Sequence, residues 1–172
     1  NLDTGGVSVH DVLPEAERHL DFGDLAVFYD EGMVAHLKAL RLAVLPNETG
    51  GVLLGYHDFN VGAIVLVDAL PAPSDSHCSP GSFERGIADL AKAVQDASAR
   101  TAGIVGYVGE WHSHPRGHAA RPSQDDLIQL AELSLGMHDD GLPALQLIVG
   151  ENDIEVLKGT VKRSEEHTSE LQ

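Results

Sequence analysis

The sequence predicts a single α/β domain in which helices flank a mixed sheet. Its 172 residues are near the usual size of one domain and are enough to bury a sizeable core. Hydrophobic residues make up 42% of the chain and charged residues 22%, as in ordinary globular proteins. Apolar runs of strand length alternate with stretches of helical period. This mixed order favours a sheet covered by helices.

The first half of the chain predicts three strands and one helix. The apolar runs that predict strands cover residues 25–29, 52–56 and 61–70. Between the first two runs, four apolar side chains share one helix face: Met33, Leu37, Leu40 and Val44. Pro46 ends that helix. The second and third strands are expected to be neighbours, because only a short polar connection separates them.

The second half predicts a loop, a helix, a strand, a helix and two strands. Their expected ranges are 71–81, 83–97, 104–111, 124–137, 144–149 and 154–157. The helix over 124–137 is expected to bury Leu127, Leu130, Ala131 and Ser134 on one side. We interpret residues 1–24 as an irregular lead-in or linker, 25–162 as the domain, and 163–172 as a non-native or disordered tail.

Composition narrows the classes of partner. The formal net charge is −16, so the average field repels nucleic acid and anionic lipid. No apolar run approaches the roughly 20 residues that a membrane span needs. A single cysteine, Cys78, fits a reducing compartment. We therefore expect no nucleic-acid or membrane partner and a cytoplasmic location.

One stretch, residues 110–126, combines several features of a metal site. His112 and His114 are two residues apart at the end of an expected strand, so their side chains project to the same side. Ser123 is placed to cap the following helix, and Asp126 lies in its first turn. Two imidazoles and one carboxylate suit Zn²⁺, and three protein ligands leave a fourth position for water. This pattern predicts one catalytic zinc ion per chain.

A hydrolytic zinc site also needs a general base, usually a carboxylate. Glu48 is a candidate because it precedes an expected strand at Gly50 and Gly51, where backbones can approach closely. Glu110 shares strand parity with His112 and could serve instead, or orient a ligand. Spacing alone leaves both open.

Other polar residues near this stretch have simpler interpretations. We interpret His118 as a solvent-facing loop residue and Asp125 as a carboxylate that stabilises the helix dipole. His77 and Cys78 lack a metal partner at useful spacing. None of these four is included among the predicted site residues.

Three segments, NETGGVLLG, GEWHSHP and SQDD, together resemble the JAMM/MPN+ metalloproteases. The likeness covers residues 25–158 and implies the JAB/MPN fold, a cytidine-deaminase-like mixed sheet flanked by helices. It implies that zinc is held by His112, His114 and Asp126. It also implies that Glu48 is the catalytic acid/base and that Ser123 donates a hydrogen bond to the oxyanion. The implied activity is removal or processing of ubiquitin or ubiquitin-like proteins.

The segment GYVGEWHSHP, with tryptophan before the first histidine, is most similar to prokaryotic JAB domains. Some of these belong to bacterial antiphage CBASS operons or are joined to E1/E2-like proteins. The resemblance thus implies ubiquitin-like conjugates as substrates and E1/E2-like proteins as partners. Four alternatives remain: a processing peptidase for a sulfur-carrier protein, a RadC-like protein, a mononuclear iron oxygenase, and a non-catalytic scaffold of the same fold.

Overall fold

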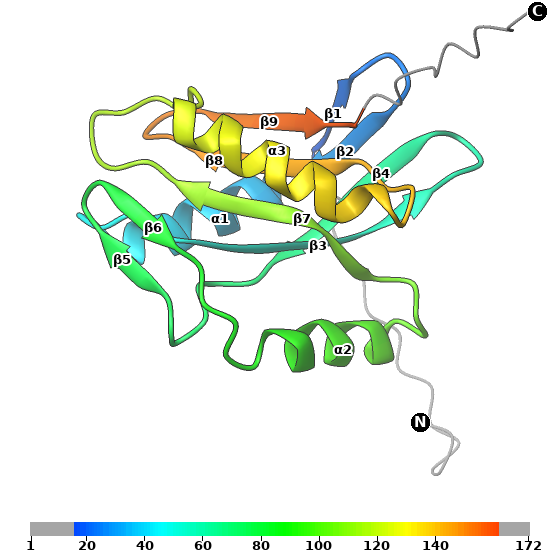
Figure 1. Ribbon diagram of the computed structural model, residues 1–172, viewed down its shortest axis with the longest axis horizontal. Coiled ribbons are helices and arrows are strands. Elements are labelled where there is room, and N and C mark those ends of the chain that lie inside the picture. The colour runs from blue at the N-terminus through cyan, green and yellow to red at the C-terminus, as the bar shows by residue number, and fades with distance from the viewer. Residues whose placement is uncertain (1–15, 162–172) are drawn as a thin grey trace, which may run out of the picture.

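The computed structural model describes residues 16–161, which form one mixed sheet with helices on both faces (Figure 1). The sheet has the order β1-β2-β4-β3-β7-β8-β9. Its strands are β1 (Glu17–Asp21), β2 (Ala26–Asp30), β3 (Gly50–Asp58), β4 (Ala63–Ala69), β7 (Gly106–Ser113), β8 (Ala144–Val149) and β9 (Ile154–Gly159). The pairs β2–β4 and β7–β8 are parallel, and the others are antiparallel.

Three helices and one small hairpin complete the fold. They are α1 (Glu31–Val44), α2 (Leu90–Arg100), α3 (Gln124–His138) and the paired strands β5 (His77–Ser79) and β6 (Ser82–Glu84). In Figure 1 the hairpin lies beside the end of β7 from which the chain leads on to α3. Among the described residues, no helix is long and apolar enough to cross a membrane.

The two faces of the sheet are covered by different helices. On one face, α1 packs Met33 and Leu37 against side chains of β2, β3, β4 and β8. On the other face, α2 and α3 share Tyr107 of β7 as a common neighbour. All six residues of β8 are buried because it lies between two strands and under helices. This buried centre gives the end of β7 a rigid support.

The predicted fold class is confirmed, but four local predictions differ from the structure. Glu17–Asp21 is a strand paired with β2, although it lies within the expected irregular lead-in. Residues 1–15 of that lead-in, and the tail 163–172, lie outside the described residues. Residues 77–79 of the expected loop form β5. A three-residue strand is too short to produce a clear pattern.

The expected helix over 83–97 was wrong at its start, because α2 begins at Leu90. Phe83 belongs to β6, and its ring lies so close to Gly50 that a side chain there would clash. The segment before α2 is held by Asp75, whose carboxylate accepts hydrogen bonds from the backbone N–H groups of Ile87 and Ala88. These tertiary contacts keep the segment before Leu90 out of the helix, although its apolar residues recur with a helical period.

The expected buried face of α3 was also partly wrong. Leu127 and Ala131 are exposed, whereas Leu130 and Ser134 are buried as predicted. Asp126 and Met137 complete the buried side. The helix is rotated so that the Asp126 carboxylate, rather than an apolar side chain, faces the sheet beside the histidines.

Candidate metal centre

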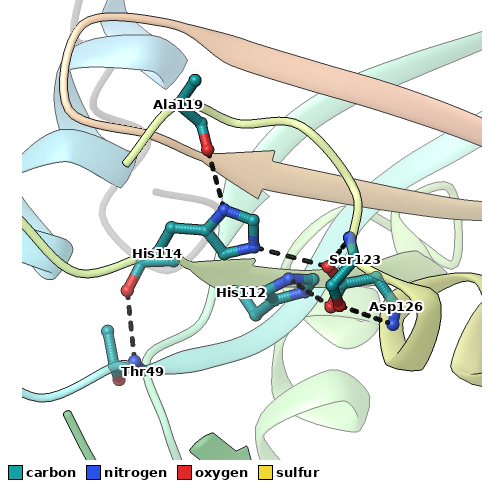
Figure 2. Close-up of polar contacts among 7 residues, drawn as sticks. Thr49, His112, His114, Ala119, Ser123 and Asp126 are labelled. Carbon is teal, nitrogen blue, oxygen red and sulfur yellow. Dashed lines mark hydrogen bonds and ion pairs between the residues drawn. The ribbon is translucent and has the colours of Figure 1, made fainter. Parts of the chain in front are cut away.

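Three candidate ligands converge where β7 meets the start of α3 (Figure 2). The Nε2 atom of His112 lies 2.9 Å from Asp126 Oδ1, and Nε2 of His114 lies 3.4 Å from Asp126 Oδ2. One ligand atom from each residue can be chosen so that all three lie within 4.8 Å of one another. The structure therefore brings together the three side chains that the spacing predicted as ligands.

The sheet and its neighbours orient both histidines. Beyond the last residue of β7, the backbone N–H of His114 donates to Val149 of β8, so the strand pairing continues through the ligand. His114 Nδ1 lies 2.8 Å from the Ala119 carbonyl oxygen, and as a donor to that carbonyl it leaves Nε2 free to bind an ion. His112 is 8% exposed, and its buried Nε2 forms no aligned hydrogen bond within residues 16–161, although it lies 2.9 Å from Asp126 Oδ1.

A capping box at the start of α3 fixes Asp126. The Ser123 backbone N–H donates to Asp126 Oδ2 at 2.7 Å, and the Asp126 backbone N–H donates to Ser123 Oγ at 3.2 Å. Because the Ser123 hydroxyl accepts in this box, its own hydrogen is available to a ligand. Capping and donation to a substrate are thus compatible roles for Ser123.

Glu48 reaches the same region through an unexpected clamp. The buried Ser113, between the two histidines, accepts a hydrogen bond from the Thr49 N–H at its hydroxyl, and its N–H donates to the Thr49 carbonyl. The Glu48 N–H donates to the Ser79 carbonyl of β5 at 2.8 Å. Glu48 then lines a cavity of about 600 Å³ together with His112, His114, Ser123 and Asp126.

Gly50 and Gly51 allow this close approach. A Cβ atom on Gly51 would lie 2.0 Å from the Leu70 carbonyl oxygen, and one on Gly50 would lie 2.4 Å from that of Trp111. Both contacts are with backbone atoms, which cannot move aside cheaply. Glycine is therefore required where β3 passes between β4 and β7.

The two carboxylates left open as general base occupy different cavities. Glu48 lines the cavity of the three ligands, whereas Glu110 accepts a hydrogen bond from Arg85 Nη2 at 2.7 Å in an adjoining cavity. Of the other residues, His118 and Asp125 line the ligand cavity from exposed positions. His77 and Cys78 are exposed in β5.

Electrostatics in the cavity suit a cation with a nearby base. Burial raises the pKa of Glu48, although the positive field of the His114 and His112 imidazoles opposes this. Burial would also raise the pKa of Asp126, but the imidazoles of His112 and His114 beside its oxygens outweigh burial and lower it strongly. The same contact with Asp126 raises the pKa of His114. Asp126 is thus ionised and can bind a cation.

Arg41 of α1, which was not among the predicted site residues, supports the backbone of the segment that carries the candidate ligand His114. Arg41 is 4% exposed, and its Nε and Nη2 donate to the carbonyl oxygens of His114 and Pro115 at 2.8 and 2.9 Å. No carboxylate in residues 16–161 pairs with it. A signal was present, because Arg41 continues the four-residue spacing of the buried Met33 and Leu37.

The sequence of the domain that carries this site matches a known protein family. Residues 30–159 match the family described as prokaryotic homologs of the JAB domain. The chain belongs to this prokaryotic JAB family. The match includes every candidate site residue described above.

Two known proteins are similar to this JAB domain. A CD-NTase/cGAS isopeptidase of Enterobacter hormaechei subsp. hoffmannii (strain UCI 50) is 33% identical over 104 residues, which are 60% of this chain. The aligned region spans 56% of that relative. The solution structure of protein DSY2949 from Desulfitobacterium hafniense superposes with a TM-score of 0.51 over 84% of this chain and 98% of that one, at 20% identity. The second likeness concerns the fold alone.

The residues present fit a zinc ion. The donor set of two imidazole nitrogens and one carboxylate is that of catalytic zinc sites with an open position. The buried His112 Nε2 faces the Asp126 carboxylate without an aligned hydrogen bond, and an ion held between the two groups would satisfy both. The Ala119 carbonyl beside His114 Nδ1 and the Ser123 N–H that donates to Asp126 are contacts of the kind that hold metal ligands in place.

Proposed function

We propose that this JAB domain is a zinc-dependent isopeptidase that cleaves a bond between a protein C-terminus and an amine of its conjugate. The observation that carries the proposal is the convergence of His112, His114 and Asp126 in one cavity with Glu48. The name of the 33% identical relative supports isopeptide hydrolysis. Two imidazoles and a carboxylate without a nearby base would support metal binding but not hydrolysis.

In the proposed mechanism, His112, His114 and Asp126 hold the ion. Zinc, when bound there, lowers the pKa of a water molecule and polarises the substrate carbonyl. Glu48 accepts a proton from the attacking water, and its raised pKa makes it a better proton acceptor than an exposed glutamate. The Ser123 hydroxyl donates a hydrogen bond to the carbonyl oxygen as negative charge develops. Glu48 then delivers the proton to the leaving amine as the C–N bond breaks.

The substrate that we propose is a conjugate of a ubiquitin-like protein or of a CD-NTase in an antiphage system of the CBASS type. The relative is named for CD-NTase/cGAS, and this chain matches 56% of its length. E1/E2-like proteins would make such a conjugate, and we place the reaction in the cytoplasm with them. The net charge of −16 leaves protein surfaces, rather than nucleic acid, as the expected partners.

The test is hydrolysis of a purified conjugate. A CD-NTase joined through its C-terminus to a lysine of a second protein would be incubated with the full chain, either stripped of metal or loaded with one equivalent of Zn²⁺. We expect the intact CD-NTase to be released only when zinc is bound. Mass spectrometry of the intact proteins measures this release. Equal release without metal, or none with zinc bound, contradicts the proposal. Stoichiometric iron in protein purified without added metal would support an oxygenase instead.

A further inference from the structure

A second cavity, of about 380 Å³, adjoins the metal centre. Phe83, His112 and Gln129 line both cavities, so a substrate bound at the ligands can extend from one into the other. The lining residues of the second cavity come from β7 and β8 of the sheet, from the segment of β6 and from α3. We call it the Gln146 cavity, and it is lined by Phe83, Glu84, Arg85, Glu110, Trp111, His112, Gln129, Glu132, Leu133 and Gln146.

Besides His112 Nε2 at the candidate metal centre, two buried polar atoms of residues lining this cavity lack partners among the described residues. Gln146 is 3% exposed, and its Oε1 accepts no hydrogen bond. Arg85 donates from Nη2 to Glu110, but its buried Nε donates to nothing. Glu110 is also the register partner of Gln146, so both unpartnered groups lie beside the same carboxylate. Each such group destabilises the fold unless solvent or a ligand completes its hydrogen bonds.

Gln146 has no evident structural purpose. It is the one polar residue of β8, in the run ALQLIV, and its neighbours on that strand belong to the apolar core. An apolar residue of similar volume would avoid the unpartnered oxygen. A buried amide placed beside a metal centre is better explained by recognition of a ligand.

The two unpartnered groups select the chemistry of that ligand. Arg85 Nε needs an acceptor, and Gln146 Oε1 needs a donor. A carboxamide carries both on separate atoms, whereas a hydroxyl would have to serve both partners through a single oxygen. A carboxylate offers no donor and is repelled by Glu84, Glu110 and Glu132, against which Arg85 is the one cation lining the cavity. An ammonium or guanidinium group offers no acceptor and leaves Arg85 Nε unpaired.

We propose that the Gln146 cavity is a specificity subsite that binds a glutamine or asparagine side chain of the substrate. The residue recognised lies close to the cleaved bond, because His112 lines both cavities. Substrate recognition here rests on the proposed isopeptidase function. The carboxamide oxygen accepts from Arg85 Nε, and its NH₂ group donates to Gln146 Oε1.

The first test measures cleavage preference. Internally quenched peptides, with one position at a time set to Gln, Glu, Lys or norleucine, would be incubated with the zinc-loaded full chain. We expect kcat/KM at one position to favour Gln over the other three by about tenfold or more. Gln146→Met should abolish this preference, so that kcat/KM becomes the same for the Gln and norleucine peptides. Cleavage without preference, or a preference that survives in Gln146→Met, contradicts the subsite.

Two further variants separate recognition from folding. Gln95→Met, on the exposed face of α2, is the matched control and should keep the preference. Arg85→Lys keeps a cation beside Glu110 but lacks the guanidinium Nε–H, so it should reduce the preference for Gln. Gln146→Met should unfold at a temperature no lower than that of the unmodified chain, since it removes an unpartnered group. A lowered unfolding temperature would show that Gln146 has a structural partner and contradicts the subsite.

A second measurement decides the subsite even if no peptide is cleaved, an outcome that would count against the proposed function. The ¹⁵N-labelled zinc-loaded chain would be titrated with N-acetyl-glutamine methylamide and, separately, with its norleucine analogue. We expect saturable shifts of the side-chain amides of Gln146 and Gln129, which both line the cavity, with the glutamine compound alone. In Gln146→Met the Gln129 shift should disappear. Equal shifts from both compounds, or none, overturn the subsite.

Discussion

The two ends of the central sheet each carry a cavity lined by histidines and carboxylates. Among the described residues, these side chains converge closely enough to bind a metal ion at one end only. At the end where β7 finishes, three ligand atoms lie within 4.8 Å of one another. At the opposite end is a larger cavity of about 740 Å³, lined in part by Asp24, His57, His138 and Lys158. Within residues 16–161, the histidines and carboxylates of this second end do not form a metal-binding group.

The difference lies in what holds the side chains. At the metal centre each ligand comes from an ordered element: His112 from β7, His114 from its continuation along β8, and Asp126 from the capped start of α3. At the opposite end Asp24 pairs with Lys158, and His57 stacks on the exposed Phe59. Convergence on rigid elements, rather than cavity volume, makes a chemical site.

The largest expected effect concerns Glu48, the proposed general base. Glu48→Gln removes the proton acceptor but keeps the shape of the side chain, so we expect kcat to fall by about 10²–10⁴-fold with zinc still bound. His138→Gln, which replaces a titratable side chain by the same amide at the opposite end of the sheet, is the control. Initial rates and metal content of both variants check this. A Glu48→Gln rate within about twofold of the unmodified chain would remove Glu48 from the mechanism.

The next effect concerns metal affinity. Asp126→Asn removes the anionic ligand and should weaken zinc binding by more than about 100-fold, because even outer contacts of metal ligands are worth 10–100-fold. Asp24→Asn makes the same chemical change at the opposite end and should leave affinity unaltered. Competition with a chromophoric chelator measures both. If the two variants bind zinc equally well, the ends of the sheet do not differ as described.

A smaller effect on the same affinity is expected from Arg41, which donates to the His114 and Pro115 carbonyls. Arg41→Met should lower zinc affinity by about 10–100-fold, and Arg41→Lys by less, since one donor can remain. Lys38→Met, three residues earlier at a half-buried position of α1, is the control. Substituting Co²⁺ adds a visible spectrum that reports ligand geometry. Arg41 is purely structural if unfolding temperature falls but the spectrum and affinity stay the same.

The smallest effect is a graded pH dependence confined to the metal centre. Because Asp126 raises the pKa of His114, the metal-free site binds a proton below that raised value. In the folded, metal-free chain this proton stabilises the site at low pH, and the stabilisation is lost as pH rises through the raised pKa. Zinc must displace the proton, so affinity should fall by about tenfold per pH unit below that pKa. Titrations between pH 8 and pH 6 measure this, and a flat profile contradicts it.

The sequence analysis succeeded where local spacing determines geometry. The i and i+2 histidines at a strand end, and the Ser-x-x-Asp box at a helix start, specify directions within a few residues. It could not choose between Glu48 and Glu110, because that choice depends on the long-range pairing of β3 with β7 and on the Thr49–Ser113 clamp. No local pattern encodes such a pairing.

The failures share a physical cause. The start of α2 and the face of α3 were predicted from apolar period, yet Asp75 and Phe83 anchor the first, and the Asp126 carboxylate turns the second. In each case a tertiary contact of a polar or aromatic side chain outweighs a periodic preference worth only tenths of a kcal/mol per residue. Arg41 and Gln146 are buried polar residues within apolar patterns, and an apolar period alone does not predict a role for either.

The most direct test of the central claim is X-ray absorption spectroscopy at the zinc edge of the full chain loaded with one equivalent of Zn²⁺. The account predicts two imidazole nitrogens and oxygen ligands at about 2.0–2.2 Å, with loss of one imidazole signal in His112→Ala and in His114→Ala. A sulfur ligand at about 2.3 Å, which Cys78 would have to supply, or an unchanged spectrum in both variants would contradict it.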